Sequence, residues 1–446
     1  MWVALGVCAF SLALRVTWAC FAHVTPVSDF HGYDMFAVRW IDNGTFGWKE
    51  RMAYRTPGYP GFLALVYLAF GHSWKVAAVV QACLGGFTSG GLVLLAGKIA
   101  SARSAAIAGL CHALSPTAVA YIPVLASENL AVPLVVLSVL LLAWSAAGNR
   151  WSRAALAGCA GLGFGLLLLV RPAALFFCPA FLLLAAYSFR RSEWRLVPPL
   201  VFIAAGALVL APWLVRNHRA GLGATTLSTS GGINLWMGNN DLAVHGGYCR
   251  EAAWPGDRPE GEADRAYAAA ARAWILGHPG SYAALCWTRL RRIIGTEPDV
   301  WVTKYFWPTA ESDEAQRALR KFARSSDPEL EPLAQRARQA HGRNLKYLRR
   351  YRRVVAPLMV VALLLSLARW RAYVYVSLPA VCYLGCLAAT FFQPRFRELS
   401  DPLLFVPLAA LLADVFWGTH DLGRWPNRWM KLALLAVAVG LTYALS

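Results

Sequence analysis

Long apolar runs separated by short polar connections fill most of this 446-residue chain. A helix needs about twenty apolar residues to cross a bilayer. Runs close to that length recur along the chain, and a protein with so many is polytopic and all-α. The pattern predicts about eleven membrane-spanning helices, over residues 2–23, 75–97, 104–122, 129–147, 154–170, 173–187, 196–214, 354–368, 372–391, 402–417 and 430–446.

One further apolar stretch, residues 57–70, is only 14 residues long. That length is typical of an interfacial or re-entrant helix. Basic residues in short connections mark the cytoplasmic side, and here they fall on one side only if residues 57–70 do not cross. We therefore expect residues 24–74 to form an outer loop with interfacial helices. The basic connections contain Lys98 and Arg103, Arg150 and Arg153, Arg190, Arg191 and Arg195, Arg369 and Arg371, and Arg424, Arg428 and Lys431.

The longest polar region predicts a subdomain outside the membrane. Its first part is rich in Gly, Ser, Thr and Asn, and residues 263–278 and 314–353 have the pattern of charged helices. A basic cluster at residues 346–353 opposes this sidedness, but charge bias is a weak guide in long loops. The chain thus divides into a transmembrane module (1–214), an extracytoplasmic α-rich subdomain (215–353) and C-terminal transmembrane helices (354–446).

Two carboxylates follow the first predicted span. Apolar and aromatic residues recur at three- and four-residue steps after Asp29, which predicts a helix with Asp29 at its N-terminus. A carboxylate at a membrane surface is costly and typical of a functional site. Asp29 is equally compatible with an ordinary helix cap, and Asp34 with a solvated helix face.

More polar residues are predicted at the same outer face. Glu128 begins an otherwise apolar helix, where a negative charge also suits the helix dipole. Arg171 precedes Pro172 and is also compatible with simple snorkelling. Guanidinium groups at Arg55, Arg216 and Arg395 have the paired donors that suit a phosphate. The Gly- and amide-rich stretch that contains Asn234, Asn239 and Asn240 has a composition suited to lining a polar ligand.

Charge and composition restrict the chemistry. The chain has 43 Lys and Arg against 24 Asp and Glu, a net charge of +19. These basic residues cluster at segment ends and in the long loop, which indicates topology and anionic lipid rather than nucleic acid. No nucleotide-binding glycine loop, Ser/His/Asp set or His metal pattern is present. Carboxylates and arginines must therefore do the chemistry. Cys249 and Cys286, both in the long loop, could pair if that loop is extracytoplasmic.

Several of these motifs together resemble a known family. The order of Asp29 with Tyr33 and Ala37, the stretch 55–64, Ser127-Glu128 and the loop 232–240 resembles the bacterial GT-C glycosyltransferases related to protein O-mannosyltransferases and lipid A aminoarabinose transferases. The resemblance covers about the first 240 residues. It implies a GT-C fold and transfer of a sugar from a polyprenyl-phosphate donor to a lipid, glycan or protein acceptor. Arg55 with separated prolines departs from the family's usual Lys or His, so sugar and acceptor stay open.

The resemblance also implies roles for individual residues. Asp29 would be the catalytic base, and Asp34 and Glu128 would assist it or bind the acceptor. A polyprenyl phosphate leaves without a general acid, and a single displacement inverts the anomeric carbon. Transfer would occur on the periplasmic face of the inner (plasma) membrane. No cofactor is certain, and a divalent metal stays open. The phosphate would be held by Arg55, Arg171, Arg216 and Arg395, and the substrates lined by Tyr33, Tyr59, Asn234, Asn239 and Asn240.

Two other classes of polytopic protein remain as alternatives. A lipid-linked glycan flippase or transporter also needs many spans and intramembrane arginines, but such proteins often show internal repeats. An O-antigen polymerase or ligase also has a large outer loop, but its pattern lacks the early acidic motif. Polar residues gathered at one face beside a large outer region favour an enzyme.

Overall fold

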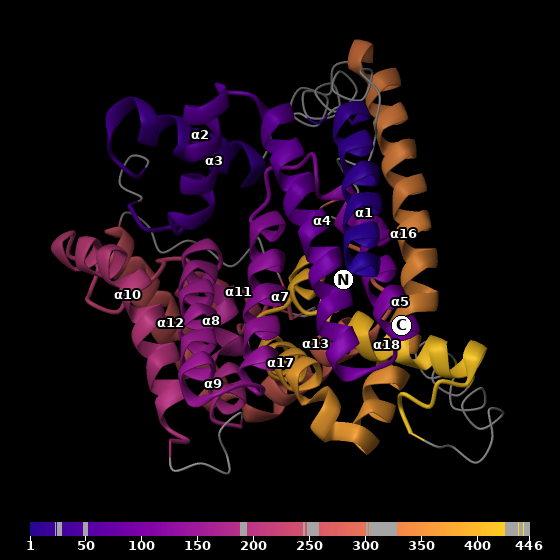
Figure 1. The fold of residues 1–446 in the computed structure, drawn as a ribbon. Helices are drawn as coiled ribbons and strands as arrows, with labels where there is room; N and C mark the ends of the chain where they lie inside the picture. Colours follow the sequence, from indigo (N-terminus) through magenta and orange to yellow (C-terminus); the bar gives the residue numbers. More distant parts are fainter. Residues whose placement is uncertain are drawn as a thin grey trace.

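Helices form every regular element among the residues that the structure describes (Figure 1). The structure is a computed structural model, and it describes residues 1–22, 24, 29–47, 52–187, 194–243, 246–247, 258–299, 302, 328–423, 436 and 440. The all-α fold class predicted from the apolar runs is therefore confirmed.

The apolar helices form a bundle, and the chain is a multi-pass membrane protein. Each predicted span up to residue 417 contains a helix: α1 (Trp2–Phe21), α4 (Trp74–Ile99), α5 (Ala102–Ala113), α7 (Glu128–Ser145), α8 (Arg150–Val170), η1 (Pro172–Phe177) with α9 (Cys178–Tyr187), α10 (Val197–Arg219), α16 (Glu331–Ser366), α17 (Trp370–Ala389) and α18 (Asp401–Trp417). Six helical segments of the described chain are long and apolar enough to cross a membrane. The span predicted at 430–446 lies outside the described residues apart from 436 and 440, so the count of eleven stays a prediction.

One predicted span is broken in the middle. Within residues 104–122, α5 ends at Ala113 and a short helix, α6 (Pro116–Ala120), follows. The side chain of Ser115 caps α6, and Pro116 occupies its first turn, where its missing N–H is not needed. This arrangement starts a new helix instead of continuing α5.

The segment predicted as the first outer loop folds as two short helices at one end of the bundle. α2 (Asp29–Asn43) starts at Asp29, as predicted. α3 (Gly58–Phe70) has only 13 residues and stops at Gly71, whose φ of 80° favours glycine. Both helices lie at the end of the bundle where α1 ends and α4 starts (Figure 1). This placement supports the prediction that residues 57–70 do not cross the membrane.

Small residues allow some spans to approach closely. A Cβ built on Gly165 of α8 would lie 2.8 Å from the Gly206 carbonyl oxygen of α10. Contacts of this kind let helix backbones pack directly in a membrane, where no hydrophobic effect drives helices together. The α8–α10 pair therefore forms a close-packed part of the bundle.

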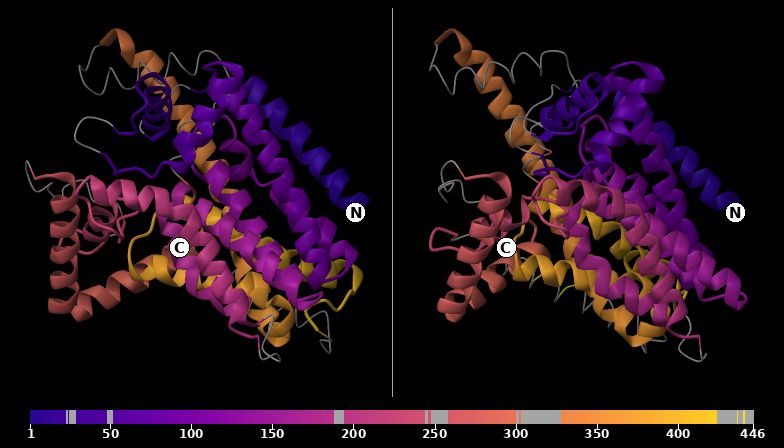
Figure 2. Two further views of the ribbon diagram at one scale, coloured as in Figure 1. Left: turned by 60° about the vertical axis from the view of Figure 1, so that its left-hand side comes forward. Right: turned by 90° about the vertical axis from the view of Figure 1, so that its left-hand side faces the viewer.

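The long polar region contains α11 (Gly231–Gly238), α12 (Glu260–Gly277), α13 (Pro279–Ile294) and η2 (Pro328–Leu330). α12 and α13 lie together at one side of the bundle (Figure 2). The buried Arg289 of α13 donates to carbonyl oxygens of Gly238 and, at 3.1 Å, of Ala388. These bonds attach α11 and α13 to the end of α17.

The predicted division at residues 353–354 falls within one continuous helix. α16 has 36 residues; it is charged up to Arg353 and apolar from Val354 to its end. It contains Pro357 without ending there, which a helix tolerates when packing re-satisfies the freed carbonyl. The division into three regions otherwise stays a prediction.

Candidate active site

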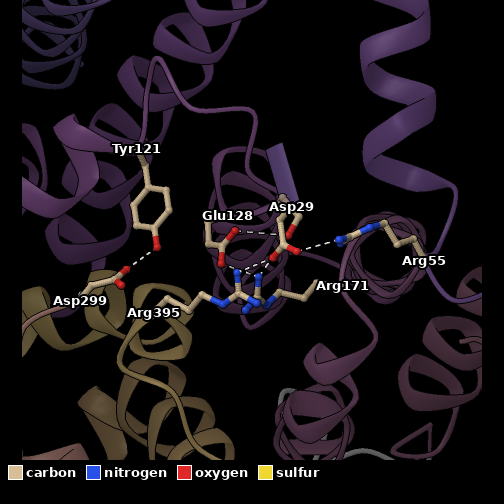
Figure 3. Close-up of polar contacts among 8 residues, drawn as sticks. Asp29, Arg55, Tyr121, Glu128, Arg171, Asp299 and Arg395 are labelled. Atoms are coloured by element: carbon tan, nitrogen blue, oxygen red, sulfur yellow. Dashed lines mark hydrogen bonds and ion pairs between the residues drawn. The ribbon is translucent and has the colours of Figure 1, made fainter. Parts of the chain in front are cut away.

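Asp29 lies between two arginines that come from opposite ends of the chain (Figure 3). Arg55 Nη2 donates to its Oδ1 at 2.7 Å, and Arg395 Nη1 donates to its Oδ2 at 2.7 Å. Arg55 lies just before α3, and Arg395 is the second residue of η4 (Pro394–Leu399), which follows α17. One carboxylate therefore joins the first outer loop to the C-terminal helices.

The two arginines determine the protonation state of Asp29. Burial alone would raise its pKa, but the charges and hydrogen bonds of Arg395 and Arg55 hold the pKa well below its usual range. Burial alone would lower the pKa of Arg395, but the negative charges of Asp29 and Glu128 raise it. Asp29 is therefore ionised, and it has little affinity for a proton while both arginines contact it.

A second ion pair lies beside the first. Arg171 follows the end of α8 and donates through Nη1 to Glu128 Oε1 at 2.6 Å and to Ser127 Oγ at 3.1 Å. Both side chains of the pair are almost fully buried, with exposures of 10% and 5%. Glu128 starts α7, so the end of α8 and the start of α7 are linked at the same place. Glu128 thereby fixes the guanidinium of Arg171.

These groups border a cavity of about 640 Å³. Asp29, Arg55, Arg171 and Arg395 give it a charged wall. By chemistry, the other lining residues form a polar set, called the polar wall, and an apolar set, called the apolar wall; Leu175 of the apolar set is 49% exposed. The polar wall contains Thr225, Thr226, Ser228, Ser230, Asn234 and Asp264, and the apolar wall contains Val170, Pro172, Ala173, Phe176, Leu227, Leu235, Leu387, Phe391 and Phe396.

Two of the residues predicted to line substrates also reach this cavity. The ring of Tyr33 lies under the guanidinium of Arg55, 4.5 Å from ring centroid to Cζ, and orients it by a cation–π contact. Asn234 lies on α11 and faces the cavity from the polar wall. The structure thus brings together Asp29, Glu128, Arg55, Arg171, Arg395, Tyr33 and Asn234.

Asp34 is placed outside the cavity lining. Its Oδ1 accepts from Tyr67 Oη at 2.7 Å and contacts His72 Nε2 at 2.9 Å. These contacts fasten α2 to the end of α3 and to the turn that follows it. Asp34 therefore has structural partners and no place beside Asp29 in the charged wall.

Arg216 also lies away from the lining. Its guanidinium donates to the carbonyl oxygens of Met52 and Phe46, at 2.9 and 2.7 Å. These bonds support the segment that leads to Arg55. Arg216 therefore supports the site and does not belong to the charged wall.

The remaining predicted residues are bonded inside the protein. Tyr59 is fully buried and donates to Gln81 Oε1 at 2.5 Å. The Asn239 side chain donates to the carbonyl oxygens of Leu235 and Thr390, and that of Asn240 to the carbonyl of Trp236. Each amide fixes the turn after α11 and does not line the cavity.

No signal in the sequence points to Asp264, which lines the polar wall. It lies within an amphipathic helix whose charges resemble an ordinary solvated face. Glu260, one turn earlier, accepts from the backbone N–H of Met52 at 2.6 Å. Neither the place of Asp264 in the cavity nor the bond of Glu260 to Met52 can be predicted from the local sequence, because both depend on how α12 packs.

Two further expectations concern a metal and a disulfide. Among the described residues, no group of three or more His, Cys, Asp or Glu side chains is placed to hold a metal ion. Cys249 lies outside the described residues, so its pairing with Cys286 stays a prediction.

Comparison with known proteins identifies the fold. Residues 54–215 match the family described as dolichyl-phosphate-mannose-protein mannosyltransferase. The fold resembles the crystal structure of the Archaeoglobus fulgidus oligosaccharyltransferase in complex with Zn and sulfate, with a TM-score of 0.50 and 15% identity over 99% of this chain and 52% of that one. The chain has the GT-C fold. This chain spans about half the length of that oligosaccharyltransferase.

The GT-C fold agrees with the resemblance found in the sequence. A further similar structure is ArnT from Cupriavidus metallidurans in the apo state, with a TM-score of 0.44 and 14% identity over 93% of this chain and 78% of that one. Among curated proteins, none matches the sequence significantly. The family match begins at Tyr54, so it includes Arg55, Glu128 and Arg171 of the site.

Proposed function

We propose that this chain is a membrane glycosyltransferase. It moves a sugar from a polyprenyl-phosphate donor to a hydroxyl-bearing lipid, glycan or protein acceptor on the extracytoplasmic face, with inversion. The observation that carries the proposal is Asp29, held by Arg55 and Arg395 in a cavity that also has an apolar wall. The family matched by residues 54–215 is described by a lipid-phosphate sugar, which supports the donor class.

The arginines suit the donor phosphate. Arg55, Arg171 and Arg395 line one cavity, and guanidinium groups bind phosphate oxygens through paired N–H donors. The apolar wall, which includes the partly exposed Leu175, offers the prenyl chain a path from the cavity toward the lipid. A ligand with an anionic head and an apolar tail matches both walls.

Donor binding also activates the base. Before the donor enters, Asp29 accepts one hydrogen bond from Arg55 and one from Arg395. A phosphate that takes these donors releases Asp29, whose pKa then rises toward that of an ordinary carboxylate. The carboxylate gains proton affinity only when the leaving group is in place. This order disfavours deprotonation of water or acceptor in an empty site.

The transfer then needs one displacement. The acceptor oxygen attacks the anomeric carbon while its proton passes to Asp29. The bond between that carbon and the phosphate oxygen breaks, and the electron pair leaves with the polyprenyl phosphate. The arginines stabilise the charge that develops on this leaving group. Glu128 contributes by holding Arg171 in position.

The proposal is tested with the purified chain reconstituted in vesicles. A panel of undecaprenyl-phosphate-linked sugars is supplied with cell-envelope extract, and mass spectrometry follows sugar transfer and release of undecaprenyl phosphate. We expect transfer from one donor class that requires Asp29. Movement of the lipid-linked sugar across the vesicle membrane with no release of undecaprenyl phosphate would instead support the flippase alternative and contradict the proposal.

A further inference from the structure

A second carboxylate faces the cavity that contains Asp29. Asp264, on α12, lines the polar wall. It makes no ion pair with any residue in the described part of the chain. Its Oδ1 accepts from the backbone N–H of Gly232 at 2.6 Å. A carboxylate accepts about four hydrogen bonds, so Asp264 keeps capacity for a ligand.

The position of Asp264 is fixed by close packing. A Cβ on Gly232 would lie 2.9 Å from the Asp264 Oδ1 atom and closer still to its carbonyl oxygen, so only glycine lets α11 meet α12 here. Glu260, at the start of α12, accepts from the N–H groups of Met52 and Ala53 at 2.6 and 3.2 Å. α12 is thereby tied to the segment that leads to Arg55. These bonds fix the position of the polar wall relative to the charged wall.

The neighbours of Asp264 in the cavity have the chemistry of a sugar site. The amide of Asn234 has no hydrogen-bond partner among the described residues and offers both donors and an acceptor. Ser230 Oγ pairs with Ser228 Oγ at 2.8 Å, and both line the cavity. Carboxylate, amide and hydroxyl groups together match the hydroxyls of a sugar. The negative charge of Asp264 would repel a phosphate, which the arginines attract.

The protonation of Asp264 points the same way. Burial is the main cause that raises its pKa above the usual value, and the nearby charge of Glu260 adds to this effect. A partly desolvated carboxylate is stabilised by hydrogen-bond donors or by a positive charge, and a ligand in the cavity supplies them. Hydroxyl and ammonium groups meet this need, whereas a second carboxylate does not.

We propose that Asp264 and Asn234 form the subsite for the sugar of the lipid-linked donor, and that Asp264 selects sugars with a hydroxyl or ammonium group over uronates. The inference rests on the proposed function, because the sugar must lie in the cavity that holds its phosphate. The subsite determines specificity and takes no part in proton transfer. Asp29 keeps that role.

The test measures lipid binding in the absence of acceptor. The purified full chain is titrated with undecaprenyl phosphate and with undecaprenyl phosphate linked to a neutral hexose, an amino sugar or a uronate. Asp264→Asn keeps the shape and the acceptor for Gly232, and it removes the charge. Glu262→Gln is the matched control, since Glu262 is exposed on the same helix and does not line the cavity.

We expect Asp264→Asn to lower the affinity for the hexose- or amino-sugar lipid by about tenfold and to reduce the preference for that lipid over the uronate lipid. The affinity for bare undecaprenyl phosphate should not change. Glu262→Gln changes none of these affinities. If wild type and Asp264→Asn bind each of the three sugar lipids with equal affinity, the inference is wrong. This holds even if the variant transfers sugar to the acceptor more slowly. Failure of wild type to bind bare undecaprenyl phosphate would contradict the proposed function itself.

Discussion

Asp29 is one carboxylate shared by two guanidinium groups. The sequence left two interpretations of it open, a helix cap and a functional carboxylate, and the structure distinguishes them. A helix cap would satisfy backbone N–H groups, whereas the structure directs both oxygens of Asp29 to Arg55 and Arg395. Asp34 instead bonds to Tyr67 and His72, outside the cavity. The two aspartates of one helix therefore have different expected roles.

The change Asp29→Asn is expected to remove the proposed general base of the reaction. Loss of a general base typically slows a reaction ~10² to 10⁴-fold, and sugar transfer should fall by that order. Asp34→Asn should keep transfer within about tenfold of wild type and lower the melting temperature, because it weakens bonds that fasten α2. Transfer rates and thermal melting of both purified variants check this. A folded Asp29→Asn enzyme with normal transfer, beside an inactive Asp34→Asn, would reverse the assignment.

Arginine-to-lysine changes separate phosphate binding from support. Arg395→Lys keeps the charge and loses the fork, so we expect affinity for undecaprenyl phosphate to fall about tenfold. Arg216→Lys is the matched control, since Arg216 bonds to backbone carbonyls outside the lining. It should lower the melting temperature and leave this affinity unchanged. Binding titrations and melting curves give both readouts, and equal affinity losses in the two variants would contradict the placement of Arg216.

At the scale of elements, the site depends on how the start of α3 packs on the end of α8. A Cβ on Gly58 would lie 2.6 Å from the carbonyl carbon of Leu169, two residues before Arg171. Both Arg55 and Arg171 are therefore held by one close contact. Any side chain at position 58 must shift the backbone of α3 or that of Leu169, and each of these segments leads to one of the two arginines.

Gly58→Ala is expected to destabilise the protein by roughly 1–3 kcal/mol, the usual cost of overpacking, and to reduce transfer because the arginines move. Gly6→Ala is the control, since a Cβ on Gly6 of α1 meets nothing within 4 Å. That change should be neutral or slightly stabilising. Thermal melting and transfer assays decide, and identical behaviour of the two variants would refute the packing argument.

Apolar length predicted the elements well, but it could not predict the partners of the charged groups. The helix starting at Asp29 and the short helix at 58–70 followed from periodicity and length. The break at Ser115-Pro116 and the continuity of α16 were missed, because local signals compete with packing there. The Asp29–Arg395 and Glu128–Arg171 pairs join residues 366 and 43 positions apart, and only the folded chain brings them together.

At the scale of the whole molecule, the proposed sidedness has a direct test. Lys75 and Arg103 are exposed residues that lie beyond or near the two ends of α4. Single cysteines at each position in a Cys-free background should react with a membrane-impermeant thiol reagent from opposite sides. We expect position 75 to be labelled from outside and position 103 only after permeabilisation.

A cysteine at Lys75 that is labelled only from the cytoplasm would mean that residues 57–70 cross the membrane. The membrane would then separate Asp29 and Arg55 from the residues that follow α3, and the proposed outer loop and the site built on it would be wrong. Labelling of a cysteine at the exposed Glu262 provides the internal control, because α12 shares the cavity with Asp29 and must lie on the same side.

The separation of the two arginines of Asp29 along the chain also governs when the protein becomes active. Arg55 follows Asp29 by 26 residues, but Arg395 follows it by 366. At a synthesis rate of about 5–20 residues per second, the nascent chain spends roughly 20 to 70 s in the membrane with only one of the two arginines of the proposed phosphate site. A chain released early, before residue 395, could fold its first helices without ever acquiring this site. The proposed activity toward a lipid-linked donor would thus begin only once translation has nearly finished.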